Sequence, residues 1–229
     1  MKYNTIIFDL DGTISNTESG IFKAFRKMMK EFGVDESKFD LKKFIGPPIQ
    51  WSFYQIFGDD MRLFKALDYF RGVYLDFMTD NTLYDGVKEL LEKLAADGLA
   101  LGVATSKYEP YAVKVLKELG VLEYFGFVFG SVGDRNEKAD GLRAAVEGKN
   151  LDVKSCLLVG DTLYDMRGAA ACGMDVLGVT YGFGRAEDFE EKARALTGSK
   201  YALALSSGTA ALITALKGIG IRPGDEIIT

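Results

Sequence analysis

The chain has 229 residues, and its 28 lysines and arginines against 33 aspartates and glutamates give a net charge of −5. A hydrophobic fraction of 48% is typical of a globular protein with a buried core, and the length favours one or two domains. The acidic balance, without a basic block, argues against a nucleic acid partner. The sequence contains no histidine, which excludes a Ser-His-Asp triad, a Cys-His dyad and an HExxH zinc site.

Targeting and redox signals are sparse. Cys156 and Cys172 offer one possible pair, and we interpret them as two reduced thiols of a cytoplasmic protein. The apolar run near the N-terminus is too short for a signal peptide or a membrane span, so no membrane partner is expected.

Residues 5–10 (TIIFDL) form a short apolar run that ends at an Asp-Gly turn signal, which predicts a buried, parallel strand. From about residue 16 to residue 79 the sequence is aromatic, rich in Met and periodic as in helices. Gly33, the Gly46-Pro47-Pro48 turn and Gly58 interrupt it. This segment predicts a separate helical insertion.

Beyond Asp85-Gly86, predicted helices alternate with predicted strands, which indicates βαβ units. The fold class is therefore α/β: a Rossmann-like parallel sheet with helices on both faces and an inserted helical cap. The expected core comprises residues 1–15 and 82–184, and the expected cap comprises residues 16–81. The expected helices are 87–96, 110–119, 139–146 and 163–172, and the strands are 99–104, 127–129, 156–159 and 176–179.

Polar side chains follow the predicted strands, where ligands bind in open α/β sheets. Crowded carboxylates repel one another, and a hard cation such as Mg²⁺ relieves that repulsion. Together with a hydroxyl and a lysine, they predict a phosphoryl-binding site. In chain order these residues are Asp9 and Asp11, then Thr105, Ser106 and Lys107, then Lys138, and finally Asp161 and Asp165.

Each of these signals also has an ordinary structural interpretation. An Asp-Gly pair after a strand is most often a turn, and the aspartates of GDxxxD are common at helix N-termini. Lys138 would equally suit an exposed surface. The joint occurrence of these residues at successive strand ends is what the structural interpretations leave unexplained.

Four segments resemble the motifs of the haloacid dehalogenase (HAD) superfamily, and the helical insertion resembles its cap. The segment FIGPPIQWSF resembles the cap of the phosphoglycolate phosphatase-like and 5′-nucleotidase-like branch. The resemblance covers about residues 1–184. The motif segments are FDLDGT at 8–13, VATSK at 103–107, Lys138 in NEKAD, and VGDTLYD at 159–165.

The resemblance implies a phosphatase that hydrolyses a small phosphomonoester through an aspartyl-phosphate. Asp9 would be the nucleophile, and Asp11 the general acid and then the general base. The partner would be a small phosphorylated metabolite, and the protein a monomer or homodimer. Thr105, Ser106 and Lys138 would bind the phosphoryl group, and Mg²⁺ would be bound by Asp9, the backbone carbonyl of Asp11, Asp161 and Asp165.

Two relatives within the superfamily fit less well. Haloalkanoic acid dehalogenases lack an aspartate at the position of Asp11, and β-phosphoglucomutases often use a cap histidine that this chain lacks. A phosphomutase nevertheless stays an alternative, as does an inactive fusion. In the cap, Lys42, Lys43 and the Gly46 turn are candidates to face the leaving group, but a solvated helix end explains them equally well. Trp51, Phe53, Tyr54 and Phe57 are interpreted as core.

The segment from about residue 188 departs from the phosphatases and resembles an N-terminal part of the DegT-type pyridoxal-phosphate sugar aminotransferases. Ser207, Gly208 and Thr209 match the residues that hold the cofactor phosphate in that family. The rest of that active site is absent, so aminotransferase activity is not expected. We expect residues 185–229 to supply a last strand (201–205) and helix (208–216) of the core, or an exposed edge at 226–229.

Overall fold

The computed structural model describes residues 2–184. Its centre is a parallel five-stranded sheet with the strand order β5-β4-β1-β6-β7, so the first strand lies in the middle. The predicted α/β class is confirmed. The strands are β1 (Thr5–Phe8), β4 (Ala100–Tyr108), β5 (Phe127–Ser131), β6 (Cys156–Gly160) and β7 (Asp175–Gly178).

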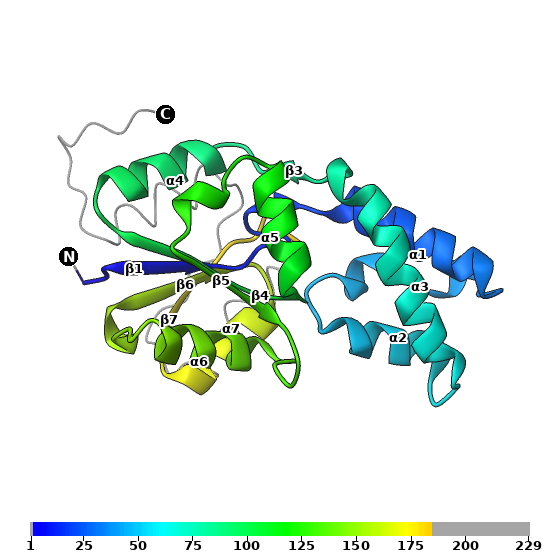
Figure 1. The fold of residues 1–229 in the computed structure, drawn as a ribbon. Helices are drawn as coiled ribbons and strands as arrows, with labels where there is room; N and C mark the ends of the chain where they lie inside the picture. Colours follow the sequence, from blue (N-terminus) through cyan, green and yellow to red (C-terminus); the bar gives the residue numbers. More distant parts are fainter. Residues whose placement is uncertain (1, 185–229) are drawn as a thin grey trace.

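Both faces of the sheet are covered by helices, because every central strand is apolar on both sides. On β1, Ile6 and Phe8 belong to one buried cluster, whereas Ile7 belongs to the other. As Figure 1 shows, α4 (Val87–Ala96) and α5 (Glu109–Glu118) lie on one face, and α6 (Lys138–Gly148) and α7 (Leu163–Cys172) lie on the other.

Helices also form a separate layer at the end of the sheet (Figure 1). These are α1 (Glu18–Glu31), α2 (Ile49–Phe57) and α3 (Arg62–Phe77), and we call residues 17–81 the cap. Phe25 of α1 is fully buried there, with ring centroids 5.3 Å from Phe44, 5.8 Å from Phe53 and 4.6 Å from Phe70. The cap therefore has an aromatic core of its own.

A two-stranded antiparallel ribbon joins the cap to the sheet. It pairs β2 (Ser15–Asn16) with β3 (Thr82–Leu83), so the chain enters and leaves the cap side by side. Five short 3-10 turns complete the described elements, at Glu36–Lys38, Leu41–Phe44, Met78–Asp80, Leu122–Tyr124 and Val153–Ser155. Within residues 2–184 we find no helix with the length and apolar character needed to cross a membrane.

Two sequence predictions need correction. Trp51 and Tyr54 were expected in the core, yet they are 40% and 51% exposed, because α2 turns only its Ser52 and Phe53 side fully inward. The strand expected to end at residue 104 continues to Tyr108, with a shift in its pairing to β5 after Ala104. The predicted strand and helix at 201–205 and 208–216, and the edge at 226–229, lie outside the described residues.

Candidate active site

The end of β1 supplies two aspartates. Asp9 is 3% exposed, and its N–H donates to the carbonyl of Val159 at 2.8 Å, so its backbone is still fixed by the sheet. Asp11 lies two residues further on, and Gly12 follows it with a positive φ of 91°. An added Cβ at Gly12 would collide with the carboxylate of Asp161, so glycine is required for the close approach of the two loops.

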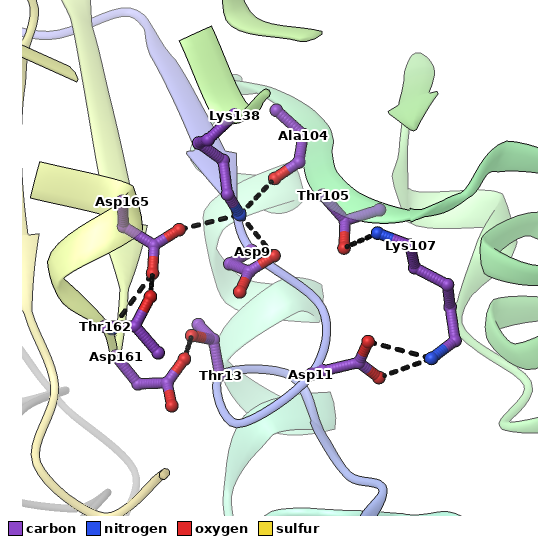
Figure 2. A network of polar contacts seen from close by, with 10 residues as sticks. All are labelled: Asp9, Asp11, Thr13, Ala104, Thr105, Lys107, Lys138, Asp161, Thr162 and Asp165. Atoms are coloured by element: carbon purple, nitrogen blue, oxygen red, sulfur yellow. Dashed lines mark hydrogen bonds and ion pairs between the residues drawn. The ribbon is translucent and has the colours of Figure 1, made fainter. Parts of the chain in front are cut away.

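Lys138, the first residue of α6, connects the end of β1 with β4 and α7 (Figure 2). Its Nζ lies 2.6 Å from Asp9 Oδ1 and 2.7 Å from Asp165 Oδ1, and donates to the carbonyl of Ala104 at 3.1 Å. Burial alone would lower the pKa of Lys138, but Asp165 and Asp9 outweigh it and the net pKa is raised. Lys138 therefore carries its positive charge into a buried site.

The loop after β6 and the first turn of α7 supply the other two carboxylates, Asp161 and Asp165. Asp165 Oδ2 accepts from the backbone N–H of Thr162 at 2.9 Å and from its hydroxyl at 2.8 Å, which caps α7 and leaves Oδ1 for Lys138. Asp161 accepts from the hydroxyl of Thr13 at 3.2 Å and from the N–H of Phe183 at 2.7 Å. Helix capping thus holds Asp165 in place, and two loops hold Asp161.

Asp9, Asp161 and Asp165 form a cluster in which each offers a carboxylate oxygen within 4.8 Å of the others. Burial raises the pKa of Asp9 to about 7, since Lys138 offsets only part of that effect, and burial with the charge of Asp165 raises the pKa of Asp161. Within residues 2–184, no second cationic side chain pairs with the cluster. Excess buried negative charge on hard oxygen donors is what a divalent cation such as Mg²⁺ fits.

Asp11 pairs with a different lysine from the one that contacts the cluster. Both of its carboxylate oxygens accept from Lys107 Nζ, at 2.9 and 2.8 Å (Figure 2). The ammonium lies 4.8 Å from the ring centroid of Tyr74 on cap helix α3. Burial alone would lower the pKa of Lys107, but the charge of Asp11 outweighs it and the pKa is raised. The sequence placed Lys107 at this end of the sheet but did not predict its pairing with Asp11.

Hydroxyl groups come from β4. Thr105 Oγ1 accepts from the backbone N–H of Lys107 at 3.2 Å, and the buried hydroxyl of Ser106 has no hydrogen-bond partner among the described residues. Both residues line a cavity between the sheet and the cap. An unpartnered buried hydroxyl at a cavity wall is available to a ligand.

The cavity has a polar floor and mostly apolar walls. Asp9, Asp11, Thr105, Ser106 and Lys107 line it from the core, and Ser131 adds a hydroxyl. The other lining residues are Ile21, Phe44, Ile45, Gly46, Pro47, Ile49, Phe70, Arg71, Tyr74, Tyr108 and Tyr111.

The structure changes which cap residues are candidates to contact a leaving group. Gly46 and Pro47 line the cavity as considered from the sequence. Lys42 and Lys43 do not, because they are exposed and lie 3.8 Å from Glu18 and 4.0 Å from Asp40 respectively. Arg71 on α3 lines the cavity, and sequence reasoning did not single it out. The sequence carried no signal for it, because Arg71 resembles any charge on an amphipathic helix.

Acidic, hydroxyl and lysine side chains at the ends of a parallel sheet form a site suited to a phosphoryl group and a divalent cation. Residues 6–179 match the family described as haloacid dehalogenase-like hydrolase, and the chain belongs to that family. It is a phosphoric monoester hydrolase.

Individual relatives with phosphatase and kinase names match most of this chain. The chain is 33% identical to a 5′-nucleotidase from Pseudomonas aeruginosa over 82% of this chain and 87% of that protein. It is 35% identical to the tyrosine-protein kinase PtkA of Mycobacterium tuberculosis, over 82% of this chain but 65% of that protein. A predicted phosphatase from Clostridium acetobutylicum has a similar structure, with a TM-score of 0.83, 32% identity and coverage of 95% of this chain and 100% of that one.

A second family matches the rest of the chain. Residues 179–229 match the DegT/DnrJ/EryC1/StrS aminotransferase family, which confirms the resemblance noted for the tail. The match begins at Val179, directly after β7, and therefore earlier than residue 188. That residues 185–229 complete the core stays a prediction, because they lie outside the described residues.

Proposed function

We propose that the protein hydrolyses a small phosphomonoester in an Mg²⁺-dependent reaction that passes through an aspartyl-phosphate on Asp9. The observation that carries the proposal is the buried cluster of Asp9, Asp161 and Asp165, in which Lys138 contacts Asp9 and Asp165. Asp9 lines a cavity together with Thr105 and Ser106. Phosphoglycolate-like compounds and nucleoside monophosphates are the substrate classes we propose to test. A 5′-nucleotidase among the relatives supports the second class.

In the first step, a carboxylate oxygen of Asp9 forms a bond to phosphorus while the bond from phosphorus to the leaving oxygen breaks. Asp11 donates a proton to that oxygen, so the leaving group departs as an alcohol. In the second step, Asp11 takes a proton from water, and the water oxygen attacks phosphorus. The phosphate leaves and the Asp9 carboxylate is restored.

The remaining residues position and neutralise the phosphoryl group. Thr105 and Ser106 have hydroxyls suited to its oxygens, and the ammonium of Lys138 offsets the negative charge that gathers beside Asp9. A Mg²⁺ ion would be held by Asp9, the backbone carbonyl of Asp11, Asp161 and Asp165. When bound, it would supply the positive charge that lets a phosphate dianion approach a carboxylate.

The test is release of inorganic phosphate from p-nitrophenyl phosphate with Mg²⁺, with EDTA, and by the Asp9→Asn variant. Turnover is expected for the wild type with Mg²⁺, and none is expected with EDTA or for Asp9→Asn. Asp59→Asn serves as a matched control, because Asp59 is an exposed aspartate of the cap. Equal activity in EDTA would contradict the metal requirement, and activity of Asp9→Asn would contradict the nucleophile. A panel of phosphoglycolate and nucleoside monophosphates then identifies the substrate class.

A further inference from the structure

Among the described residues, two positively charged side chains line the cavity, and their ion pairs differ in strength. Lys107 is held by both oxygens of Asp11 and is itself buried. Arg71 has a weak partner instead, since its guanidinium lies 3.7 Å from Asp68, whose side chain is 79% exposed. An exposed pair of this kind contributes little stability, so Arg71 can change partner at small cost.

The backbone at Arg71 is fixed against the core. The hydroxyl of Tyr111, which lies on α5 beneath the cap, donates to the carbonyl oxygen of Arg71 at 3.3 Å. Phe70 and Tyr74, the neighbours of Arg71 on α3, line the same cavity. Arg71 is thus placed on the cap wall of the cavity that has Asp9 at its floor.

The walls between these two points offer few charges. Tyr108 and Tyr111 lie with ring centroids 5.1 Å apart, and Phe44 and Ile45 add apolar surface. The charge of a guanidinium beside such a wall is less screened than it would be in open solvent. Its parallel N–H groups can form two hydrogen bonds to the oxygens of a carboxylate or a phosphate.

From this arrangement we propose that Arg71 is a specificity-determining residue that binds a second anionic group on the leaving part of the substrate. The substrate class is a phosphomonoester whose alcohol carries a carboxylate or a second phosphate. This inference rests on the proposed phosphatase reaction and narrows its substrate. The reacting phosphoryl group occupies the floor at Asp9, and Arg71 holds the opposite end of the molecule.

Three substrates that share a two-carbon skeleton test the proposal. In 2-phosphoglycolate the second group is a carboxylate, in ethane-1,2-diol bisphosphate it is a phosphate, and in 2-hydroxyethyl phosphate it is a neutral hydroxyl. We expect the wild type to prefer at least one of the two anionic substrates over the neutral one by about 10- to 100-fold in kcat/KM, the range of one charge-assisted contact. The preferred substrate distinguishes carboxylate from phosphate.

The Arg71→Met variant should lose that preference, mainly through a higher KM for the anionic substrate, and Arg71→Lys should retain part of it. The ratio between substrates cancels any shared effect on folding or on the reacting centre. Arg62→Met is the matched control, because Arg62 lies on the same helix, pairs with Asp60 at 2.8 Å and does not line the cavity.

Two results would overturn the role of Arg71: a wild type that hydrolyses all three substrates equally well, or an Arg71→Met variant that keeps the preference. Better turnover of a nucleoside monophosphate than of either anionic substrate would do the same. In each case phosphate is still released, so the proposed phosphatase reaction survives. Absence of phosphate release from every substrate would instead count against the phosphatase reaction itself.

Discussion

The carboxylate cluster predicts an unusual dependence of stability on pH. Burial raises the pKa of Asp9 from its ordinary value of 3.8 to about 7. A carboxyl whose pKa is higher in the folded state contributes stability that is fully present below pH 3.8 and is lost as the pH rises through 7. The metal-free protein should therefore become less stable between pH 4 and pH 7.

The magnitude follows from the two pKa values. The difference between about 7 and 3.8, at about 1.4 kcal/mol for each pH unit, corresponds to about 4 kcal/mol in total. About 2 to 3 kcal/mol of this falls between pH 5 and pH 8.5. This is a large part of the free energy of unfolding of a typical domain.

The Asp9→Asn variant isolates this contribution, because an amide resembles the protonated carboxyl and does not titrate. In EDTA, urea unfolding at pH 5 and pH 8.5 should show the variant gaining about 2 to 3 kcal/mol on the wild type as the pH rises. The Asp59→Asn variant, an exposed control, should follow the wild type. Adding Mg²⁺ should remove most of the wild type's pH dependence, since the cation favours the ionised carboxylate.

Parallel pH dependence of the wild type and Asp9→Asn in EDTA would refute this reasoning. It would mean that the ammonium of Lys138, 2.6 Å from Asp9, fully compensates the burial of the carboxylate. The pKa of Asp9 would then be close to its ordinary value, and the electrostatic case for a cation at the cluster would fail with it.

Three further substitutions test the packing of the site and of the cap. Lys138→Met should abolish phosphate release and, in EDTA at pH 7.5, destabilise the protein by about 3 to 5 kcal/mol in urea unfolding, because two buried carboxylates lose their ammonium. Gly12→Ala should reduce phosphate release and lower the free energy of unfolding by at least about 1 kcal/mol, since φ is 91° and the new Cβ would meet the carboxylate of Asp161. The control is Gly72→Ala on α3, where a Cβ meets open space, and this variant should be as stable as the wild type or more stable. Phe25→Ala should cost about 3 to 5 kcal/mol by thermal or urea unfolding, because the ring is fully buried in the aromatic core of the cap.

The sheet and its helices were predictable because their signals are local. Helices α4 and α7 have the bounds that the sequence predicted, since each is an apolar-periodic run beside clear turn or capping residues. The strand β1 was expected to run from Thr5 to Leu10 and ends at Phe8, where the chain turns to present Asp9. Strand ends were therefore located to within a few residues, which was enough to gather the acidic residues at one edge.

The side-chain pairings were not predictable, because they depend on distances between segments that the sequence does not fix. Asp11 and Asp9 are two residues apart, yet one carboxylate pairs with Lys107 and the other with Lys138. Arg71 resembles any charge on an amphipathic helix until the cap is placed over the sheet. Conversely, Lys42 and Lys43 beside the Gly46 turn were candidates to face the leaving group or to form a solvated helix end, and both are exposed and do not line the cavity.

The buried site also links stability to ligand binding. Nothing in folding alone favours three clustered carboxylates with a lysine beside two of them, since an apolar cluster of similar volume would be at least as stable. Lys138 nevertheless occupies a fully enclosed position where Asp9, Asp165 and the carbonyl of Ala104 take up its N–H groups. A cation that completes the charge balance binds the folded chain and not the unfolded one. It therefore raises the free energy of unfolding in proportion to the logarithm of its concentration. Burying ionised carboxylates destabilises the metal-free protein at neutral pH. A bound cation relieves that destabilisation, and this relief contributes to its binding free energy.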